Sequence, residues 1–189
     1  MKKIFIVLIF LSIIKINEAQ IQVGVVLGPQ FPVGGFTDAF NSGIGFGSTG
    51  KYFMKENMAV GTNLHYNYFT GDRYYNEGRN RAAITAFTGM FQYYFSTDKI
   101  KPYAGGDFGL YFWNWRWYTY YWINPAGNPA YGYYHDNGTA LGFAPSGGIT
   151  YDITDKFVLD GNLKFNLILT ESDLNYLGMN LGLFYKFDK

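Results

Sequence analysis

The sequence contains no cysteine among its 189 residues. This absence excludes disulfide bonds, cysteine-based metal sites and thiol nucleophiles, as well as a lipoprotein anchor, which needs a cysteine at the cleavage point. Histidine is nearly as scarce, because only His65 and His135 are present. Two histidines so far apart do not have the spacing of metal ligands. We therefore expect no metal and no cofactor.

Charge is also sparse. Charged residues make up 15% of the chain, against about 25% of a typical soluble domain. Without residues 1–19 the chain keeps 12 basic and 13 acidic residues, a net charge of −1. A nucleic-acid-binding protein needs a basic stripe or patch. The composition therefore argues against a nucleic-acid partner.

The first segment has the features of a secretory signal peptide. Lys2 and Lys3 precede the apolar run Ile4–Ile14, and Ala19 stands before a plausible cleavage point at Gln20. An apolar run of eleven residues is too short to cross a membrane as a helix. We assign residues 1–19 to a signal peptide and residues 20–189 to one exported domain.

Long apolar runs are missing from the rest of the chain. Beyond Gln20 no run approaches the ~18 residues that a membrane helix requires, although 21% of the residues are aromatic and 24 are glycine. A chain of this kind can still bury apolar surface in lipid by placing apolar residues at every second position of a closed barrel.

Alternation with a period of two recurs along the chain and is clearest in residues 157–170. One face of that segment is apolar except at Gly161, whereas the opposite face carries Asp160, Asn162, Lys164 and Asn166. Successive side chains of a strand point to opposite faces, so the pattern predicts lipid on one side and a polar lumen on the other. The predicted strands are 20–28, 42–53, 58–69, 82–95, 103–112, 139–152, 157–170 and 177–187.

The connections between these segments alternate in length. Short polar turns are predicted at 55–57, 96–99 and 153–156, and longer connections at 29–41, 70–81, 114–137 and 171–175. Bacterial membrane barrels have an even strand number, short periplasmic turns and long external loops. We therefore predict an all-β fold, an eight-stranded antiparallel transmembrane β-barrel with up-and-down topology and both termini in the periplasm. The alternative is a soluble β-sandwich or lipocalin-like barrel, in which the apolar face turns inward.

The end of the chain carries a recognisable pattern. Asn180, Gly182, Tyr185 and Phe187 read polar, x, Gly, x, x, aromatic, x, aromatic, although Asp188 and Lys189 follow. This resembles the C-terminal signal by which the barrel-assembly machinery recognises outer-membrane barrels. Residues 101–106, KPYAGG, resemble a strand opening common in the same proteins. Residues 20–189 thus resemble the OmpX and OmpA-barrel family, which implies the outer membrane of a Gram-negative cell but no particular activity.

Several charged residues fall on the predicted inner face of the barrel. An eight-stranded barrel is just wide enough to be filled by side chains, and buried charges must be paired. We therefore expect an interior ion-pair network, with an ion pathway as the alternative. The residues concerned are Lys51, Asp107, Asp160, Lys164 and Lys186.

Aromatic residues crowd one region. The run 101–123 has 23 residues, more than twice the ~9–11 that a membrane strand needs. We predict a hairpin that continues past the bilayer, with its tip near 125–128. Some of its rings belong to the interfacial aromatic girdle, and the others are candidates for an external interaction surface. The candidates are Trp113, Trp115, Trp117, Trp122, Tyr118 and Tyr120.

These features favour a structural or interaction role through external loops: envelope integrity, adhesion, or membership of a larger outer-membrane complex. The expected partners are outer-membrane lipid and lipopolysaccharide, since loop 70–81 is slightly basic, and the barrel-assembly machinery during biogenesis. The second hypothesis is a narrow pore for small or apolar solutes. The third is a lipid-modifying enzyme that uses His135 beside Asp136; no nucleophile motif accompanies this pair, so we expect no enzyme and assign no catalytic residue.

Overall fold

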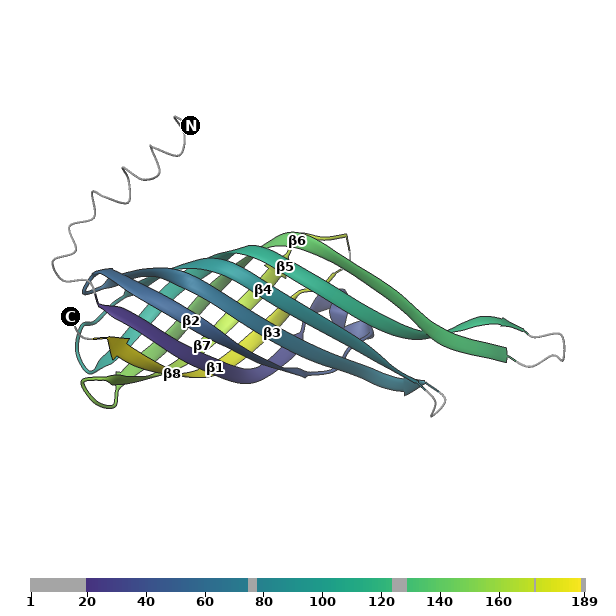
Figure 1. The fold of residues 1–189 in the computed structure, drawn as a ribbon, viewed down its shortest axis with the longest axis horizontal. Helices are drawn as coiled ribbons and strands as arrows, with labels where there is room; N and C mark the ends of the chain where they lie inside the picture. The colour runs from purple at the N-terminus through teal and green to yellow at the C-terminus, as the bar shows by residue number, and fades with distance from the viewer. Residues whose placement is uncertain (1–19, 75–77, 124–128, 172, 188–189) are drawn as a thin grey trace, which may run out of the picture.

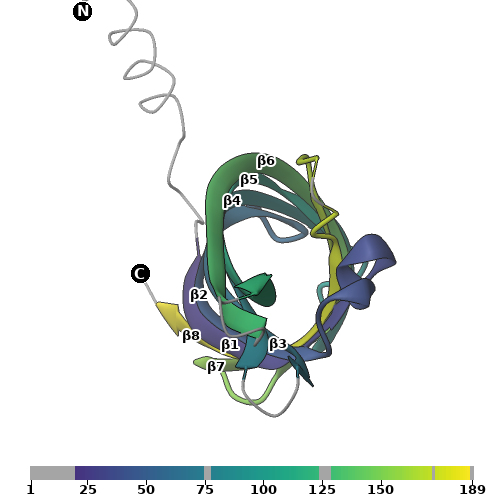
Figure 2. The same cartoon turned by 90° about the vertical axis from the view of Figure 1, so that its right-hand side faces the viewer.

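The computed structural model describes residues 20–74, 78–123, 129–171 and 173–187. The predicted signal peptide and the predicted hairpin tip lie outside these residues. Within them, eight antiparallel strands form a closed barrel, seen from the side in Figure 1 and end-on in Figure 2. The described part of the chain has no helix that is long and apolar enough to span a membrane. The elements are β1 (Ile21–Pro32), the short helix η1 (Gly34–Asp38), β2 (Gly43–Lys55), β3 (Met58–Tyr74), β4 (Gly78–Tyr94), β5 (Ile100–Ile123), β6 (Pro129–Asp152), β7 (Phe157–Ile168) and β8 (Tyr176–Phe187).

Each strand pairs with its neighbour in the sequence, and the barrel closes between the first strand and the last. Ile21 of β1 pairs with Phe187 of β8, and Pro32 at the other end of β1 pairs with Tyr176. Closure leaves no unpaired edge, which is the condition for a sheet to lie in lipid. The predicted eight-stranded up-and-down barrel is confirmed.

The side chains alternate between the two faces as predicted. In β1 every odd residue from Ile21 to Leu27 is exposed, and every even residue from Gln22 to Gln30 is buried. In β7, Asp160 and Asn166 are buried, whereas Leu163 on the opposite face is half exposed. The result is a belt of exposed Leu, Val, Ile and Phe around the barrel wall, which lipid can cover and water cannot stabilise.

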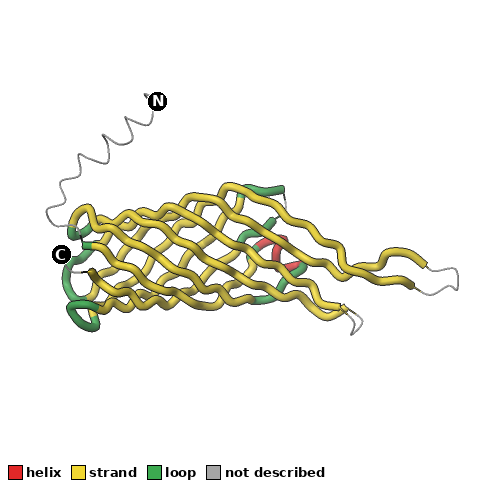
Figure 3. Tube along the Cα trace, viewed as in Figure 1, coloured by secondary structure: helices red, strands yellow, loops and turns green. Residues whose placement is uncertain are grey.

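The connections at the two ends differ, as Figure 3 shows. The β2–β3, β4–β5 and β6–β7 turns are short and lie at the end where β1 begins and β8 finishes. At the opposite end η1 lies between β1 and β2. The segments 70–81 and 114–137, which the sequence predicted as long connections, are mostly strand, because β3 pairs with β4 and β5 pairs with β6 well beyond the barrel wall. The extension of the β5–β6 hairpin is confirmed.

The lumen is filled, and the end that carries the β5–β6 hairpin is not polar. Phe36 of η1 and Phe40 fold into the mouth of the barrel and pack with Phe69, Tyr111 and Tyr176 in one buried cluster. The rings of Phe36 and Phe69 are 4.9 Å apart. The expectation of a polar interior is therefore wrong for this end. The reason is that the β1–β2 connection contributes the buried rings of Phe36 and Phe40, which strand alternation alone does not place.

Candidate functional site

The most deeply buried charges form an ion pair in the half of the lumen nearer the short turns. Lys51 of β2 donates to Asp160 of β7 over 2.6 Å, and each side chain is only 1% exposed. The Tyr103 hydroxyl donates to the second carboxylate oxygen of Asp160 at 2.9 Å. The Tyr94 hydroxyl lies 3.4 Å from the Lys51 ammonium group. Both charges thus have partners, as charges removed from water require.

A second pair lies closer to the end that carries the β5–β6 hairpin. Lys164 of β7 contacts Asp107 of β5 at 2.5 Å. The same carboxylate oxygen accepts hydrogen bonds from the Asn63 amide at 2.7 Å and the Thr88 hydroxyl at 3.2 Å. Four strands therefore meet at Asp107. The two pairs join strands on different sides of the lumen and cross-link the barrel from within.

The fifth predicted inward charge lies apart from these pairs. Lys186 of β8 pairs with Asp152 at 2.9 Å, and Lys101 pairs with the same carboxylate at 3.0 Å. This cluster sits at the end with the short turns. Sequence reasoning missed Lys101 and Asp152 because both stand at strand ends, where alternation is hard to extend. Their opposite charges at facing ends of the β5–β6 pair were the available signal.

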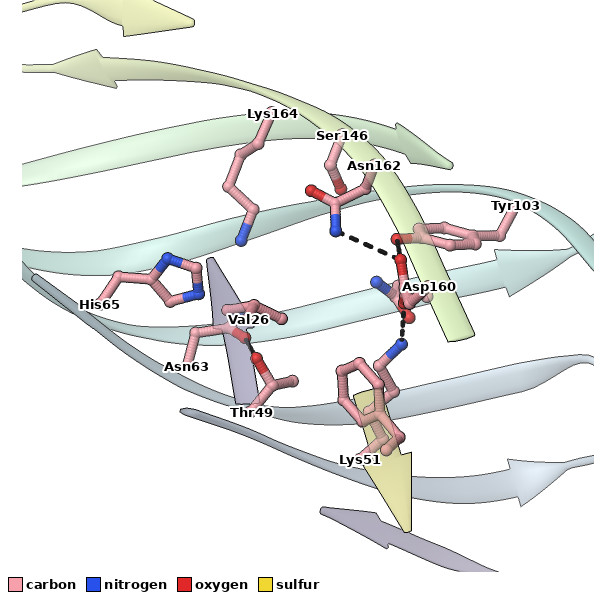
Figure 4. A pocket seen from close by; sticks show the side chains of 12 residues that line it. Val26, Thr49, Lys51, Asn63, His65, Tyr103, Ser146, Asp160, Asn162 and Lys164 are labelled. Carbon is pink, nitrogen blue, oxygen red and sulfur yellow. Dashed lines mark hydrogen bonds and ion pairs between the residues drawn. The ribbon is translucent and has the colours of Figure 1, made fainter. Parts of the chain in front are cut away.

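A small cavity separates the two buried pairs, and Figure 4 shows the side chains that line it. Its space for the centre of a water-sized sphere is about 20 Å³, which holds about one water. Two lining atoms, His65 Nε2 and Ser146 Oγ, are buried without a hydrogen-bond partner among the described residues. The cavity is too small for a solute.

Three of the predicted external aromatic residues face inward. Trp113, Trp115 and Trp117 are half-buried on the inner face of β5 and pack against the aromatic cluster at the mouth. The Trp115 ring stacks on Phe40 at 6.4 Å, and the Trp117 ring meets Phe40 edge-on at 5.7 Å. These tryptophans thus pack the base of the hairpin against the β1–β2 connection.

The other predicted aromatic residues are placed differently. Tyr118 pairs with Tyr133 across the hairpin, with ring centres 5.1 Å apart. The side chains of Tyr120 and Trp122 lie outside the described residues. In the described part of the hairpin beyond Phe112, the exposed aromatics are Tyr133 and Tyr134, with 41% and 55% exposure. These two tyrosines are not among the candidates predicted from the sequence, because the four tryptophans that define the aromatic region all lie on β5.

The histidines do not form a catalytic pair with an acid. His65 is buried in the lumen, whereas His135 is exposed and pairs with Arg116 on the outer face of the hairpin. Asp136 pairs instead with Trp115, whose side chain packs inward. Consecutive strand residues point to opposite faces, so His135 and Asp136 point apart. Among the described residues no group of three or more His, Asp or Glu side chains could hold a metal ion.

The C-terminal pattern has two faces in β8. Asn180 points inward and bonds both Gln30 and Asn162 at 3.0 Å. At Gly182 a Cβ atom would lie 2.7 Å from the side chain of Val26, so a larger residue would not fit. Tyr185 and Phe187 point outward, with ring centres 5.0 Å apart. The pattern therefore places Asn180 and Gly182 on the lumen face of β8 and Tyr185 and Phe187 on its outward face.

Comparison with known proteins identifies the fold. No family model matches the chain, and no curated protein matches its sequence. Solved structures do match: Neisserial surface protein A, with 14% identity and a TM-score of 0.56, covers 89% of this chain and 97% of its own. Ail, the attachment invasion locus protein of Yersinia pestis, in complex with the heparin analogue sucrose octasulfate, has the same four values.

A third match is the outer membrane protein OprG from Pseudomonas aeruginosa, with 14% identity and a TM-score of 0.55 over 90% of this chain and 96% of that one. Sequence identity this low establishes the fold alone. That fold is the small eight-stranded outer-membrane β-barrel, and the resemblance to the OmpX and OmpA type is confirmed at this level.

Proposed function

We propose that this outer-membrane β-barrel is a closed membrane anchor that displays the β5–β6 hairpin outside the cell as an adhesive or interaction surface. The observation that carries the proposal is the length of the hairpin. Its two strands have 24 residues each. Their pairing begins where Ile100 faces Tyr151 and ends where Ile123 faces Pro129. A membrane strand needs only about 9–11 residues, so more than half of the hairpin serves something other than crossing the bilayer.

The proposed orientation follows from the two ends of the barrel. In outer-membrane barrels the short turns face the periplasm and the long connections face outward. The three short turns, the start of β1 and the end of β8 share one end, so we place both termini in the periplasm and the hairpin outside. Surface-exposed Tyr133 and Tyr134 suit contact with a partner, because aromatic rings offer large contact area at low entropic cost.

The solved structures with this fold add support of a limited kind. Ail is by name an attachment protein, and one of its structures holds a sulfated heparin analogue. Neisserial surface protein A is by name a surface protein. Two proteins with this fold are thus named for attachment and for the surface, which supports the same use here.

The pore is the weaker hypothesis. The Lys51–Asp160 and Lys164–Asp107 pairs cross the lumen, and the phenylalanines of the β1–β2 connection pack above them. Opening a path would break two buried ion pairs, and separating a buried pair costs several kcal/mol. A lipid-modifying enzyme is weaker still, because His135 and Asp136 point to opposite faces.

The test of the proposed function is adhesion of intact cells that express the protein. Cells with the wild-type protein should bind immobilised heparin or extracellular-matrix protein more strongly than cells with an empty vector. Tyr133→Ser/Tyr134→Ser should remove most of this gain. Tyr93→Ser/Tyr151→Ser is the matched control, because both tyrosines are similarly exposed but lie near the short turns. Adhesion equal to the empty vector on every surface, or stable single-channel conductance in planar bilayers, would overturn the proposal.

We also propose that β8 carries the signal read by the barrel-assembly machinery. Tyr185 and Phe187 point outward near the chain end, where a partner protein can contact them before lipid does. Tyr185→Ala/Phe187→Ala should lower the amount of folded protein in the outer membrane several-fold, whereas Met179→Ala/Leu181→Ala on the same face should lower it less. An unchanged amount for the first variant would remove β8 from this role.

A further inference from the structure

A row of basic side chains crosses three strands on the outer face of the barrel, just beyond the apolar belt. Arg81 of β4 pairs with Arg116 of β5, and Arg116 pairs with His135 of β6. Residues that face each other across antiparallel strands point to the same side, and all three side chains are exposed. Arg79, two residues beyond Arg81, is exposed as well. We refer to Arg81, Arg116 and His135 as the basic row.

The basic row is unfavourable in isolation. Side chains directly opposite each other on neighbouring strands have Cβ atoms about 4.5–5.5 Å apart, and two like charges in such positions, here Arg81 and Arg116, destabilise the sheet. On β4, β5 and β6 the outward positions of the described segments 79–83, 112–118 and 133–139 hold Arg, Ala, Phe, Asn, Tyr, His and Thr and no acidic residue, and on β3 the residue that pairs with Arg81 is Thr70. Asp136 is next in sequence but points to the inner face. An anion from outside the chain would relieve the repulsion.

The position of the row identifies where that anion comes from. Below it lies the row Ala83, Asn114 and Asn137, and below that the row Thr85, Phe112 and Thr139. Phe112 is 44% exposed, and the exposed side chains of Leu110 and Leu141 follow it into the belt. Arg116 is four residues beyond Phe112, about 13 Å along the strand. With a strand tilt of about 40°, this is roughly 10 Å above the last belt residue, within reach of the headgroup layer of a bilayer.

We propose that the basic row binds the phosphate group of an anionic lipid in the outer leaflet, the lipid A part of lipopolysaccharide. Arginine presents a planar fork of donors that fits phosphate oxygens in pairs. Asn114 and Asn137 lie between the row and the belt, where their exposed amides can donate to sugar or phosphate oxygens. The acyl chains then extend over Phe112, Leu110 and Leu141. The inference relies on the proposed orientation, which places this end in the outer leaflet.

The test uses the full-length mature protein folded in phosphatidylcholine nanodiscs that contain a small fraction of lipid A. Native mass spectrometry after release from the nanodisc reports the lipid that stays bound. The wild type should retain bis-phosphorylated lipid A at least about tenfold better than lipid A from which both phosphates have been removed. Arg81→Gln/Arg116→Gln should lose this preference. Lys55→Gln/Lys99→Gln removes two exposed charges at the opposite end and should keep it.

Two further measurements make the result specific. The heat-dependent shift on a gel checks that each variant is folded, so that loss of lipid is not loss of the barrel. Arg81→Lys/Arg116→Lys keeps the charge without the fork and should bind between the wild type and the glutamine variant. Equal retention of lipid A by the folded glutamine variant, or retention indifferent to the phosphates, would overturn the proposal. The proposal would also be overturned if Arg81→Gln/Arg116→Gln abolished binding to soluble dextran sulfate but left lipid A retention unchanged. The basic row would then bind a soluble polyanion and not a lipid.

Separate variants distinguish the proposed lipid site from the proposed adhesive hairpin. Tyr133→Ser/Tyr134→Ser leaves the basic row intact and should not change lipid A retention, whereas Arg81→Gln/Arg116→Gln leaves both tyrosines in place. A loss of adhesion with lipid binding intact removes the proposed function alone, and the reverse result removes the lipid site alone. Inverted topology, shown by protease access to the β6–β7 turn from outside intact cells, would remove both.

Discussion

The inner half of the lumen, near the short turns, holds the ion pairs together with smaller apolar clusters, whereas the outer half, near the hairpin, is filled mainly by aromatic rings. The inner half is cross-linked by two ion pairs whose side chains are largely buried. The outer half is filled by aromatic rings, most of them brought by the β1–β2 connection and by β5. A charge pair is directional and costly to separate, whereas ring packing is tolerant of small shifts. The barrel is therefore held more firmly in the half near the short turns and packed more adaptably in the half that carries the β5–β6 hairpin.

The largest effect should come from breaking a buried pair. Asp160→Ala leaves the Lys51 ammonium group buried without its counter-charge, and it also removes the acceptor of the Tyr103 hydroxyl. We expect a loss of about 3–5 kcal/mol in the free energy of unfolding, the usual cost of removing one partner of a buried pair. Urea unfolding in lipid vesicles, followed by tryptophan fluorescence, measures it.

The double variant Lys51→Met/Asp160→Leu is the control for this experiment. Replacing both charges by apolar side chains of similar size should recover most of the lost stability. If Asp160→Ala unfolds at the same urea concentration as the wild type, the pair does not hold the inner half together and the contrast between the halves fails.

A smaller effect should come from the outer half. Phe40→Ala removes the ring on which Trp115 and Trp117 pack, and it leaves a cavity at the barrel mouth. Truncation of a fully buried Phe costs about 3–5 kcal/mol, and we expect about 2–3 kcal/mol here because the β1–β2 connection can partly collapse. Bilayer conductance should remain absent because the inner pairs stay in place. Stable channels in Phe40→Ala would show that the aromatic half, not the charged half, closes the lumen.

The smallest effect should come from the cavity between the two ion pairs. Ser146→Ala removes a buried hydroxyl that has no hydrogen-bond partner among the described residues. An unsatisfied buried polar atom carries a desolvation penalty, so the change should be neutral or raise the free energy of unfolding by up to about 1 kcal/mol. A loss of more than about 1 kcal/mol would instead indicate that Ser146 holds a bound water that links it to the pairs.

Alternation was enough to predict the wall of the barrel. The inward position of Asp160 and the outward position of Leu163 follow from the period of two, since lipid and lumen sort side chains without reference to any distant contact. The same rule placed Lys51, Asp107 and Lys164 inside, although it did not say which lysine pairs with which aspartate. That choice depends on the shear of the closed barrel, which brings β2 opposite β7 and is not encoded in any local pattern.

The candidate interaction surface was harder to predict. Trp113, Trp115 and Trp117 alternate as a strand should, but their inner face is covered by Phe40 from a connection that has no periodic signal. The basic row was missed for a related reason. Arg81 and Arg116 are distant in sequence, and only the register of β4 against β5 places one beside the other.

The pairing of β1 with β8 also constrains how the protein can be made. The first strand to leave the ribosome has one of its two partners at the far end of the chain, since Ile21 pairs with Phe187. Until β8 arrives, β1 presents an open edge that can pair with any other extended chain, and bringing such distant segments together is the slowest kind of folding step. The chain therefore has to be kept apart from other extended chains until β8 pairs with β1, and β8 is also the strand that carries Tyr185 and Phe187.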